Sequence, residues 1–480
     1  MIGKKKIAAR VIVSLLGVAI VGASILLFLN QVAETPDGLP QYDQMLGYRT
    51  GQIANLPIPQ NAEIIEEISV AAKRAVYQIV GMSPEDNPDN AYLQAVRESG
   101  WQLQETLAAH CYIFVKDSEQ VQITILSDQL QIELITDSIQ SFLETMSLDE
   151  KLGQLLLVGF VGTEVTSELQ TLLQELQVGG VILFGRNIVS AEQLQTLTQA
   201  ITTLAPKLTP FISIDEEGGR VSRLPNDVQA SPSAATIASS GNPQFAYETA
   251  YELGLKLRAL GVTMNHAPVL DIFSNPANTV IGDRAFGSDA QVVSEFGVAT
   301  MQGLMAAKVI PTVKHFPGHG DTATDSHFGL PIVTKELAEL ENFELVPFQA
   351  AINAKSEVVM VSHILLEQID TDVPATLSKT IITDMLRTKL GFTGIVMTDD
   401  MQMGAITEYF SVAQASVQSI QAGTDVLLIG NDVTIIQEVH QALKTAVAES
   451  QISEARIDES VYRILHLKQK YNLLEFADGK

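Results

Sequence analysis

The hydrophobic pattern of the chain changes near residue 147. From there on, eight short, continuous apolar runs alternate with segments of helical period. Continuous apolar runs are typical of parallel strands that are buried on both faces. Eight of them in alternation with helices predict an α/β fold, a (β/α)8 TIM-type barrel over residues 146–474. The runs are residues 155–160, 181–184, 211–214, 262–265, 309–313, 358–361, 395–397 and 426–429.

A doubly wound open sheet is the alternative to the barrel. Four of the runs are followed, at once or nearly so, by a polar residue that can take part in catalysis: Asp215, His315, His363 and Asp399. In a barrel the carboxyl ends of all strands surround one site, whereas an open sheet needs such residues only at its switch point. The spread over four runs therefore favours the barrel.

Residues 61–140 have a different pattern. Residues 89–101 have the sequence of a capped amphipathic helix that ends at Gly100. Three further runs alternate or cluster as strands, with polar turns between them: 111–115, 121–126 and 130–135. We expect a small α+β accessory module with an antiparallel sheet. Residues 31–60 are rich in proline, lack a helical period and are expected to form a linker.

The first thirty residues have the pattern of a membrane-targeting signal. Residues 11–29 carry no charge and follow a basic flank of Lys4, Lys5, Lys6 and Arg10. A helix of this length rises about 28 Å, close to the hydrocarbon thickness of a bilayer. We expect residues 1–30 to form a single-pass transmembrane anchor with the basic flank in the cytoplasm and the rest of the chain outside. The alternative is a cleaved signal peptide and a secreted protein.

The charge balance restricts the partners. The formal net charge is -26, and the residues after the basic flank carry 26 basic against 56 acidic groups. Such a field repels nucleic acid, so we expect no nucleic-acid partner. Cys111 is the single cysteine, which excludes an intrachain disulfide and a Cys-His metal site. With 46% hydrophobic and 18% charged residues, we expect a globular, monomeric protein.

Residues 314–327 are unusually dense in reactive side chains. They read K-H-F-P-G-H-G-D-T-A-T-D-S-H, with three of the eight histidines of the chain, two aspartates and a lysine. The segment directly follows the apolar run 309–313, so it begins where a buried strand ends. Barrel enzymes keep their catalytic groups at strand ends, and the segment is therefore predicted to be a catalytic loop.

Three further motifs accompany this loop. Asp215 opens D-E-E-G-G-R-V, Gly282 opens G-D-R-A-F-G, and Thr398 opens T-D-D-M. Together with K-H-F-P-G-H-G-x4-D-S-H they resemble the bacterial β-N-acetylglucosaminidases of glycoside hydrolase family 3, over residues 146–474. Of these motifs the D-S-H loop is the most specific. Family members without D-S-H are typically β-glucosidases with a carboxylate acid/base from a second domain, and that activity stays an alternative.

The resemblance implies the catalytic residues. A retaining glycosidase needs a nucleophilic carboxylate and a proton donor for the leaving group. Asp399 matches the nucleophile of the family and ends a buried strand, while Asp400 points to the other side of an extended chain. His327 matches the general acid/base, and an imidazole suits proton delivery near neutral pH. Asp325 would orient that ring and raise its basicity.

The same resemblance implies the sugar-binding residues. Asp215 and Arg223 match positions that hydrogen-bond sugar hydroxyls, and Arg284, Lys314 and His315 match others that line the pocket. Charged side chains suit this role, because charge-assisted hydrogen bonds are the strong ones. No cofactor and no metal are implied. The remaining residues of interest are expected to support the site: His266, His319 and His363 by holding loops, and Glu217 as a supporting residue or the start of a helix.

We therefore expect a retaining exo-β-N-acetylglucosaminidase on the outer face of a bacterial cytoplasmic membrane, acting on GlcNAc-terminated saccharides such as cell-wall fragments. A phosphorylase that passes the same covalent intermediate to phosphate is an alternative. Two further alternatives are a non-catalytic wall-binding scaffold and a metal-dependent barrel hydrolase. The metal ligands of the latter would come from His315, His319, Asp321, Asp325 and His327.

Overall fold

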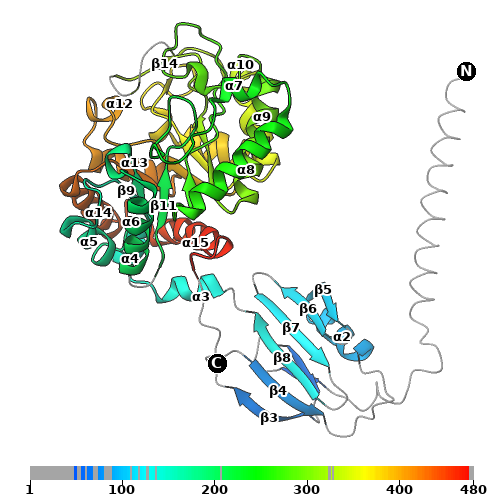
Figure 1. The fold of residues 1–480 in the computed structure, drawn as a ribbon. Helices are drawn as coiled ribbons and strands as arrows, with labels where there is room; N and C mark the ends of the chain where they lie inside the picture. The colour runs from blue at the N-terminus through cyan, green and yellow to red at the C-terminus, as the bar shows by residue number, and fades with distance from the viewer. Residues whose placement is uncertain are drawn as a thin grey trace, which may run out of the picture. The chain divides into compact units, whose positions relative to one another are not determined.

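The chain divides into two compact units, Met1–Asp137 and Ser138–Lys480, each described here by itself. The computed structural model describes residues 48–50, 56–59, 62–68, 74–79, 89–108, 111–116, 119–125, 129–135, 138–205, 208–322, 326 and 329–474 (Figure 1). Within these ranges no helix has the length and apolar character needed to cross a bilayer. The anchor predicted at residues 11–29 lies outside the described residues.

The first unit contains a six-stranded antiparallel sheet in the order β3-β4-β8-β7-β6-β5. Its helix, α2 (Asp89–Glu98), buries Leu93 and Val96, and the chain leaves it through Gly100 at a φ of 97°. The strands are β3 (Ala62–Ile68), β4 (Arg74–Ile79), β5 (Gln102–Ala108), β6 (Cys111–Lys116), β7 (Glu119–Ile125) and β8 (Gln129–Ile135).

The sequence pattern missed half of this sheet. Strands β6, β7 and β8 overlap the three predicted runs, but β3, β4 and β5 were not predicted. Strands β3 and β5 carry many Glu and Gln residues, so their apolar periodicity is weak. The linker prediction for residues 31–60 is also wrong in part, because β1 (Tyr48–Thr50) and β2 (Pro57–Pro59) form an antiparallel pair. Prolines are tolerated in such a pair because each strand has a free edge.

The second unit is a closed barrel of eight parallel strands. Each strand pairs with its neighbour in chain order, β18 pairs with β9, and a bridge between Met397 and Val426 joins β17 to β18. Each of the eight predicted runs overlaps one of these strands. They are β9 (Leu156–Val158), β10 (Gly180–Leu183), β11 (Phe211–Ile214), β12 (Met264–Asn265), β13 (Ile310–Phe316), β15 (Val358–Val361), β17 (Ile395–Thr398) and β18 (Leu427–Ile429).

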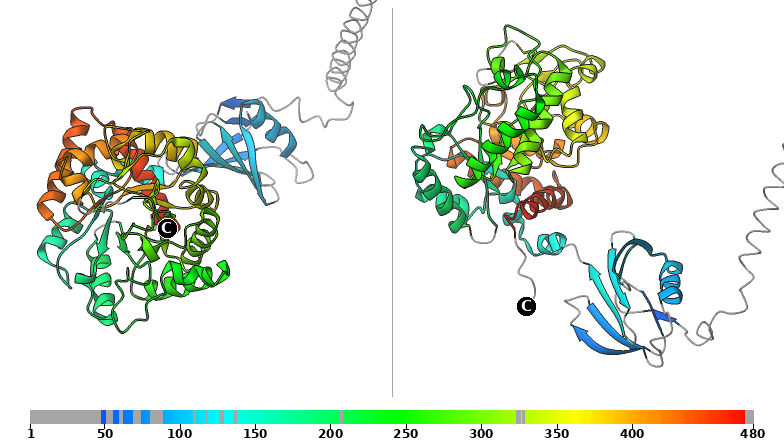
Figure 2. Two further views of the ribbon diagram at one scale, coloured as in Figure 1. Left: turned by 90° about the horizontal axis from the view of Figure 1, so that it is seen from above. Right: turned by 45° about the vertical axis from the view of Figure 1, so that its right-hand side comes forward.

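Helices surround the barrel strands (Figure 2). The first of them, α4 (Leu148–Gln154), has the capping box that its sequence predicts: Ser147 Oγ accepts from the Glu150 N–H, and Glu150 Oε2 accepts from the Ser147 N–H. The other long elements of this layer are α5 (Ser167–Gln174), α6 (Ala191–Leu204), α8 (Pro243–Ala259), α9 (Ala290–Ala306), α11 (Val346–Asn353), the π-helix η4 (Thr380–Lys389), α13 (Val412–Ala422), α14 (Val433–Ala448) and α15 (Glu454–Lys470).

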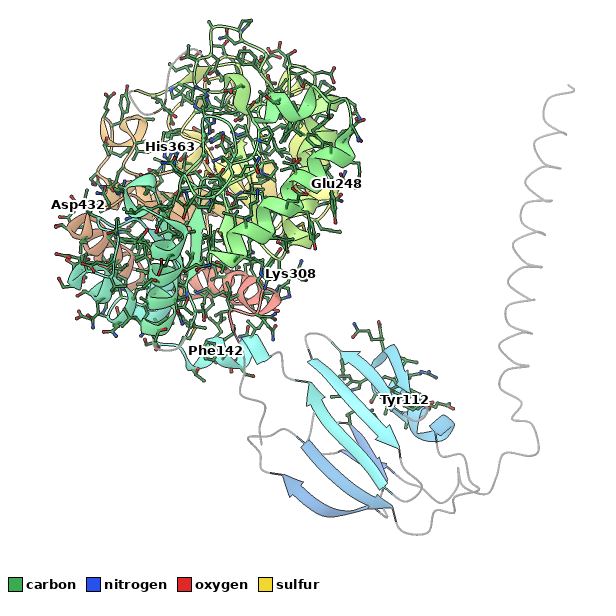
Figure 3. All side chains as sticks on the ribbon, viewed as in Figure 1. Tyr112, Phe142, Glu248, Lys308, His363 and Asp432 are labelled. Atoms are coloured by element: carbon green, nitrogen blue, oxygen red, sulfur yellow. The ribbon has the colours of Figure 1, made fainter. Side chains whose placement is uncertain are left out.

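The parallel arrangement brings the carboxyl ends of all eight strands to one rim. Asp215 directly follows β11, Lys314 and His315 are near the end of β13, and Asp399 directly follows β17. His363, labelled in Figure 3, lies two residues after β15. The strands themselves are buried and apolar, so they fix these polar residues on a rigid frame.

Candidate active site

A cavity of about 260 Å³ opens at the carboxyl end of the barrel. Six residues predicted from the sequence line it together, although they come from widely separated parts of the chain: Asp215, Arg223, Arg284, Lys314, His315 and Asp399. Glu217, His319, Ser326 and Asp400 also contribute to its wall, as do the apolar side chains of Ile182, Phe184, Met360 and Leu428. The cavity therefore combines a charged upper wall with an apolar floor made by the strands.

A buried lysine joins two carboxylates in this wall. Lys314 Nζ lies 2.6 Å from Asp215 Oδ1 and 2.7 Å from Glu217 Oε1. Burial by itself would raise the pKa of Asp215, but Lys314 outweighs it and holds that pKa below its usual range. The pKa of Lys314 is raised, because the attraction of the two carboxylates outweighs its own burial. All three groups are therefore charged at neutral pH.

Arg284 completes the cluster. Its Nε and NH2 bind the two oxygens of Glu217 at 2.7 and 2.8 Å, NH2 also donates to His315 Nε2, and NH1 donates to the Val280 carbonyl. Against the effect of burial, Lys314 and Arg284 lower the pKa of Glu217 to about 2. Because four of its five donors are bound within the protein, Arg284 orders this wall more than it reaches into the cavity.

Glu217 does not begin a helix, so that part of the sequence interpretation is wrong. Its N–H donates to the Val221 carbonyl in a tight hairpin, which Gly218 and Gly219 turn at φ values of 86° and 56°. Those positive φ angles favour glycine and explain the G-G pair of the motif. Glu217 is 5% exposed and Asp215 21%, so Asp215 is the carboxylate that a ligand can reach.

Asp271 holds His315 and His319, two residues of the cavity wall, and was not identified in the sequence analysis. Its Oδ2 lies 2.6 Å from His315 Nδ1, and its Oδ1 accepts the backbone N–H of His319 at 2.6 Å. Because Arg284 can only donate to His315 Nε2, the His315 proton lies on Nδ1 and points to Asp271. Burial by itself would raise the pKa of Asp271, but its contacts with His315 and His319 together lower it. A carboxylate directly after the apolar residues 267–270 was the available signal.

Two of the supporting histidines hold loops, as expected. His319 Nδ1 lies 2.6 Å from Thr322 Oγ1 and its Nε2 lies 3.2 Å from Ser326 Oγ. His363 Nδ1 lies 2.7 Å from Thr376 Oγ1, and its Nε2 donates to the Asp400 carbonyl at 3.0 Å. The His319 contacts link parts of the loop 314–327 to one another, and the His363 contacts tie the segment after β17 to the end of β15.

His266 behaves differently from this expectation. It is fully buried next to the Asp215–Lys314 pair, and neither of its ring nitrogens has a hydrogen-bond partner among the described residues. Burial lowers the pKa of His266 to about 4. It is therefore a neutral side chain that packs beneath the charged wall.

Asp399 and Asp400 have different surroundings. Among the described residues, the Asp399 carboxylate accepts one hydrogen bond, from the Asp400 N–H at 2.8 Å. Burial would raise the pKa of Asp399, but the nearby His315 and His363 lower it, so the carboxylate is ionised. Asp400 Oδ1 instead accepts the backbone N–H groups of Gln402 and Gly430 at 3.0 and 2.9 Å. Within the described part of the chain, the Asp399 carboxylate therefore keeps lone pairs that no donor uses, at the wall of the cavity.

Asp325 and His327, the predicted acid/base pair, lie outside the described residues. Ser326 between them is described and buried. Its Oγ contacts His319 Nε2, and its carbonyl accepts the Ala405 N–H at 3.1 Å. This residue is therefore bonded both to the loop that begins at Lys314 and to the segment after β17, where Asp399 lies.

The metal-dependent hydrolase was an alternative that required histidine nitrogens as ligands. The described histidines of that set already use these nitrogens in hydrogen bonds. Both ring nitrogens of His315 and both of His319 have hydrogen-bond partners in the protein. In the described ranges, no group of three or more His, Cys, Asp or Glu side chains has the geometry to hold a metal ion.

Comparison with known proteins identifies the family to which the barrel belongs. Residues 147–467 match the family described as glycosyl hydrolase family 3 N terminal domain. The chain is 37% identical over 292 residues to a β-hexosaminidase of Stenotrophomonas maltophilia (strain R551-3), a match that covers 60% of this chain and 86% of that protein. It is 35% identical over 333 residues to the β-hexosaminidase LpqI of Mycobacterium tuberculosis, covering 67% of this chain and 83% of that one.

Comparison with solved structures indicates the same family. The glycoside hydrolase family 3 β-N-acetylglucosaminidase from Paenibacillus sp. str. FPU-7 superposes with a TM-score of 0.68 at 40% identity, over 70% of this chain and 65% of that one. Some relatives are longer than the matched region. The chain spans 56% of the β-hexosaminidase A of Pseudoalteromonas piscicida, to which it is 33% identical over 334 residues.

Proposed function

Because the chain belongs to glycosyl hydrolase family 3, we propose that it is a retaining exo-β-N-acetylglucosaminidase that removes terminal GlcNAc from cell-wall saccharides. The main support for the proposal is the ionisation and the hydrogen bonding of Asp399. It is an ionised carboxylate at the end of a barrel strand, with one described hydrogen-bond donor, on a cavity lined by the other predicted sugar-binding residues. The names of its relatives support the choice of an N-acetylhexosamine as substrate.

The proposed first step is attack of Asp399 on the anomeric carbon. The lone pairs that the protein leaves free on Asp399 form the bond to the sugar, while the bond to the leaving oxygen breaks. The low pKa of Asp399 keeps the carboxylate ionised for this step. Asp400 is unsuited to it, because its Oδ1 is used to hold the backbone at Gln402 and Gly430.

The proposed proton donor is His327, oriented by Asp325. The leaving oxygen takes the proton in the first step, and the same imidazole then removes a proton from the water that releases the sugar. An imidazole adds no negative charge to this site, so an anionic acceptor such as phosphate meets less repulsion than it would beside a carboxylate acid/base. Detection of a sugar 1-phosphate in phosphate buffer would show phosphorolysis instead of hydrolysis.

The charged wall is proposed to bind the hydroxyls of one terminal sugar. Asp215 and Arg223 both line the cavity, and the fixed Lys314–Glu217–Arg284 cluster keeps Asp215 in place. Because the ion pairs exist before a ligand arrives, little reorganisation is needed when hydroxyls replace water at Asp215. A cavity of this size, closed by the barrel floor, suits the end of a chain and supports exo-action.

The substrate proposal is tested by comparing aryl β-GlcNAc with aryl β-glucoside. We expect faster hydrolysis of the N-acetylated substrate, with retention of β-configuration in the first-formed product. Equal rates, or faster cleavage of the glucoside, would refute the N-acetyl assignment. Inversion of configuration would refute the covalent intermediate.

We also propose that residues 11–29 anchor the enzyme to the outer face of the cytoplasmic membrane. The uncharged run and its basic flank support this location. The full-length protein should resist carbonate extraction from membranes and keep its own N-terminus. The acidic remainder of the chain gives it no electrostatic reason to adhere to anionic lipid, so retention would report the anchor itself. A secreted form that begins near residue 31 would contradict the proposal.

A further inference from the structure

Glu216 lies between the two carboxylates of the charged wall but points away from them. Asp215 and Glu217 both contact Lys314 at the cavity, whereas the side chain of Glu216 is fully buried on the other face of the extended segment. The Asn265 side chain from β12 holds its backbone at both ends, with Oδ1 accepting the Glu216 N–H and Nδ2 donating to the Glu216 carbonyl. Glu216 is thus held in a fixed position that faces away from the substrate cavity.

The hydrogen bonds to the Glu216 carboxyl are strongly asymmetric. Three donors converge on Oε2: Ser222 Oγ at 2.8 Å, Arg223 N at 2.6 Å and Leu224 N at 3.2 Å. Oε1 is buried and has no hydrogen-bond partner among the described residues. One oxygen therefore behaves as a multiple acceptor, and the other is left without any donor.

The side chain that carries this oxygen lines a small cavity behind the barrel wall. This cavity has room for about 30 Å³ and is lined mainly by apolar side chains, many of them on α8 and α9, together with Glu216, Glu217, Arg284 and Thr300. Thr300 Oγ1, on α9, is the second buried oxygen in the described part of the cavity wall with no partner. The volume is enough for one water molecule, which needs two or more polar partners.

We propose that Glu216 is a positioning residue for Arg223 and acts as a neutral carboxylic acid. Its carbonyl oxygen, Oε2, fixes the backbone from Ser222 to Leu224, and its hydroxyl, on Oε1, donates into the small cavity that it shares with Thr300. The inference deepens the proposed function and rests on it, since Arg223 matters here as a sugar-binding side chain.

Physical chemistry supports the neutral form. A carboxylic acid has one oxygen that only accepts and one that can donate, which is the asymmetry of the contacts around Glu216. An ionised carboxylate would leave a buried, charged oxygen without a hydrogen-bond donor among the described residues, at a large cost in free energy. Burial raises the pKa of Glu216 despite the three hydrogen bonds, which lower it. The proton therefore completes the hydrogen bonding that the protein leaves open.

Few described contacts fix the position of Arg223. Its guanidinium lines the substrate cavity near Asp215 and makes no ion pair with a carboxylate among the described residues. Its NH1 makes one long hydrogen bond, to the Ser222 carbonyl at 3.5 Å, while its backbone N–H donates to Glu216 Oε2 at 2.6 Å. Without that bond, the loop loses its shortest anchor, and the guanidinium no longer has a defined position for sugar hydroxyls.

The test compares Glu216→Gln with Glu216→Leu in the full-length protein. Gln keeps an acceptor at the position of Oε2 and a donor at that of Oε1, so its KM should stay within about twofold of wild type. Leu keeps the volume but removes both groups. It should raise KM about tenfold with little change in kcat, since the lost hydrogen bonds position a binding group. Glu248→Leu, which removes an exposed carboxylate on α8, is the matched control and should change neither constant.

Two readouts do not depend on activity. Hydrogen exchange of the backbone at residues 221–224 should accelerate in Glu216→Leu and stay slow in Glu216→Gln. An infrared difference spectrum of wild type minus Glu216→Gln should show the C=O stretch of a protonated carboxyl. This second measurement uses a conservative variant, so it remains informative if Glu216→Leu does not fold.

Each result decides the inference. Wild-type KM and slow exchange in Glu216→Leu would overturn the positioning role. Losses in Glu216→Gln as large as those in Glu216→Leu, or a carboxylate band in place of the protonated one, would overturn the neutral acid. If the wild type does not cleave GlcNAc substrates, the proposed function fails, while the exchange and infrared data still decide the role of Glu216 in holding the loop.

Discussion

The two ends of the barrel both place aspartates beside basic side chains, but the hydrogen bonding of these aspartates differs between the ends. At the amino end, Asp425 precedes β18 and is fully buried. Its Oδ1 accepts from Ser460 Oγ and from Arg463 NH1, at 2.6 and 2.9 Å. Its Oδ2 accepts from Arg387 NH2 and from Val396 N, at 2.5 and 2.9 Å. Asp399 at the carboxyl end accepts one described hydrogen bond.

The difference shows that buried charge alone does not mark an active site. Each oxygen of Asp425 has two donors, so Asp425 can act only as a link between α15, η4 and β17. Asp399 is ionised, retains lone pairs among the described contacts and faces a cavity. What separates the proposed nucleophile from Asp425 is therefore a hydrogen-bond capacity left unused next to a space that a substrate can enter.

The largest expected effect is at Asp399. Asp399→Asn should lower turnover by several orders of magnitude, because the amide cannot form the glycosyl ester, while the thermal unfolding temperature changes little. Asp400→Asn should have a far smaller effect, since its Oδ1 can still accept from Gln402 and Gly430. Steady-state kinetics with calorimetry checks both variants. The reverse ranking would move the nucleophile to Asp400.

The next effect concerns proton donation at the same end. His327→Ala should lower the rate on disaccharides by roughly 10²–10⁴-fold, the usual contribution of general acid catalysis, and should spare nitrophenyl glycosides. A nitrophenolate leaves without a proton, whereas a sugar alcohol does not. Rates on the two substrate classes give the measurement. Equal losses on both would leave His327 with a binding or structural role.

A substitution at the amino end should instead lower stability and leave KM unchanged. Asp425→Ala removes the common partner of Arg387 and Arg463 and should lower the free energy of unfolding by about 3 kcal/mol. We take the lower end of the usual range, because the two arginine side chains are 14% and 26% exposed. Urea unfolding gives the value, and KM of the folded fraction should be unchanged. A kinetic defect without loss of stability would break the comparison between the two ends.

The smallest effect is a pH dependence of stability from Lys468, also at the amino end. Burial lowers the pKa of Lys468 to about 7, although its Nζ donates to Gln154 Oε1 at 2.7 Å. Between about pH 7 and pH 10 the unfolded chain binds the lysine proton more tightly than the folded one, so Lys468 makes the free energy of unfolding rise with pH.

Lys468→Met should remove that rise. Urea unfolding of both proteins at pH 7, 8 and 9 isolates the contribution of Lys468, because other titrating groups cancel in the difference. The advantage of Met over Lys should be greatest at pH 7 and shrink as the pH increases. A difference that does not change with pH would mean that Lys468 stays protonated in the fold through its contacts with Gln154 and the ring of Phe211.

The sequence by itself determined the barrel and most of its rim. Strands that are buried on both faces must be continuously apolar, so all eight were visible as runs. A polar residue at or just after the end of such a run lies at the carboxyl end of the barrel, which is why Asp215, His315, His363 and Asp399 were expected there. The motif resemblance added Arg223, Arg284 and Lys314. In the first unit, β3 and β5 were missed because their many polar residues hide the alternation.

Only the tertiary structure shows which of these residues contact one another and what surrounds each of them. The chain does not show that Arg284 is bound to Glu217 and His315, or that Asp271 links His315 to His319, since these partners are far apart in sequence. It also does not separate the adjacent Glu216 and Glu217. Glu217 is paired with Lys314 and Arg284, whereas Glu216 accepts hydrogen bonds from the segment 222–224. Successive side chains of an extended segment point to opposite faces, and the surrounding elements set the environment of each.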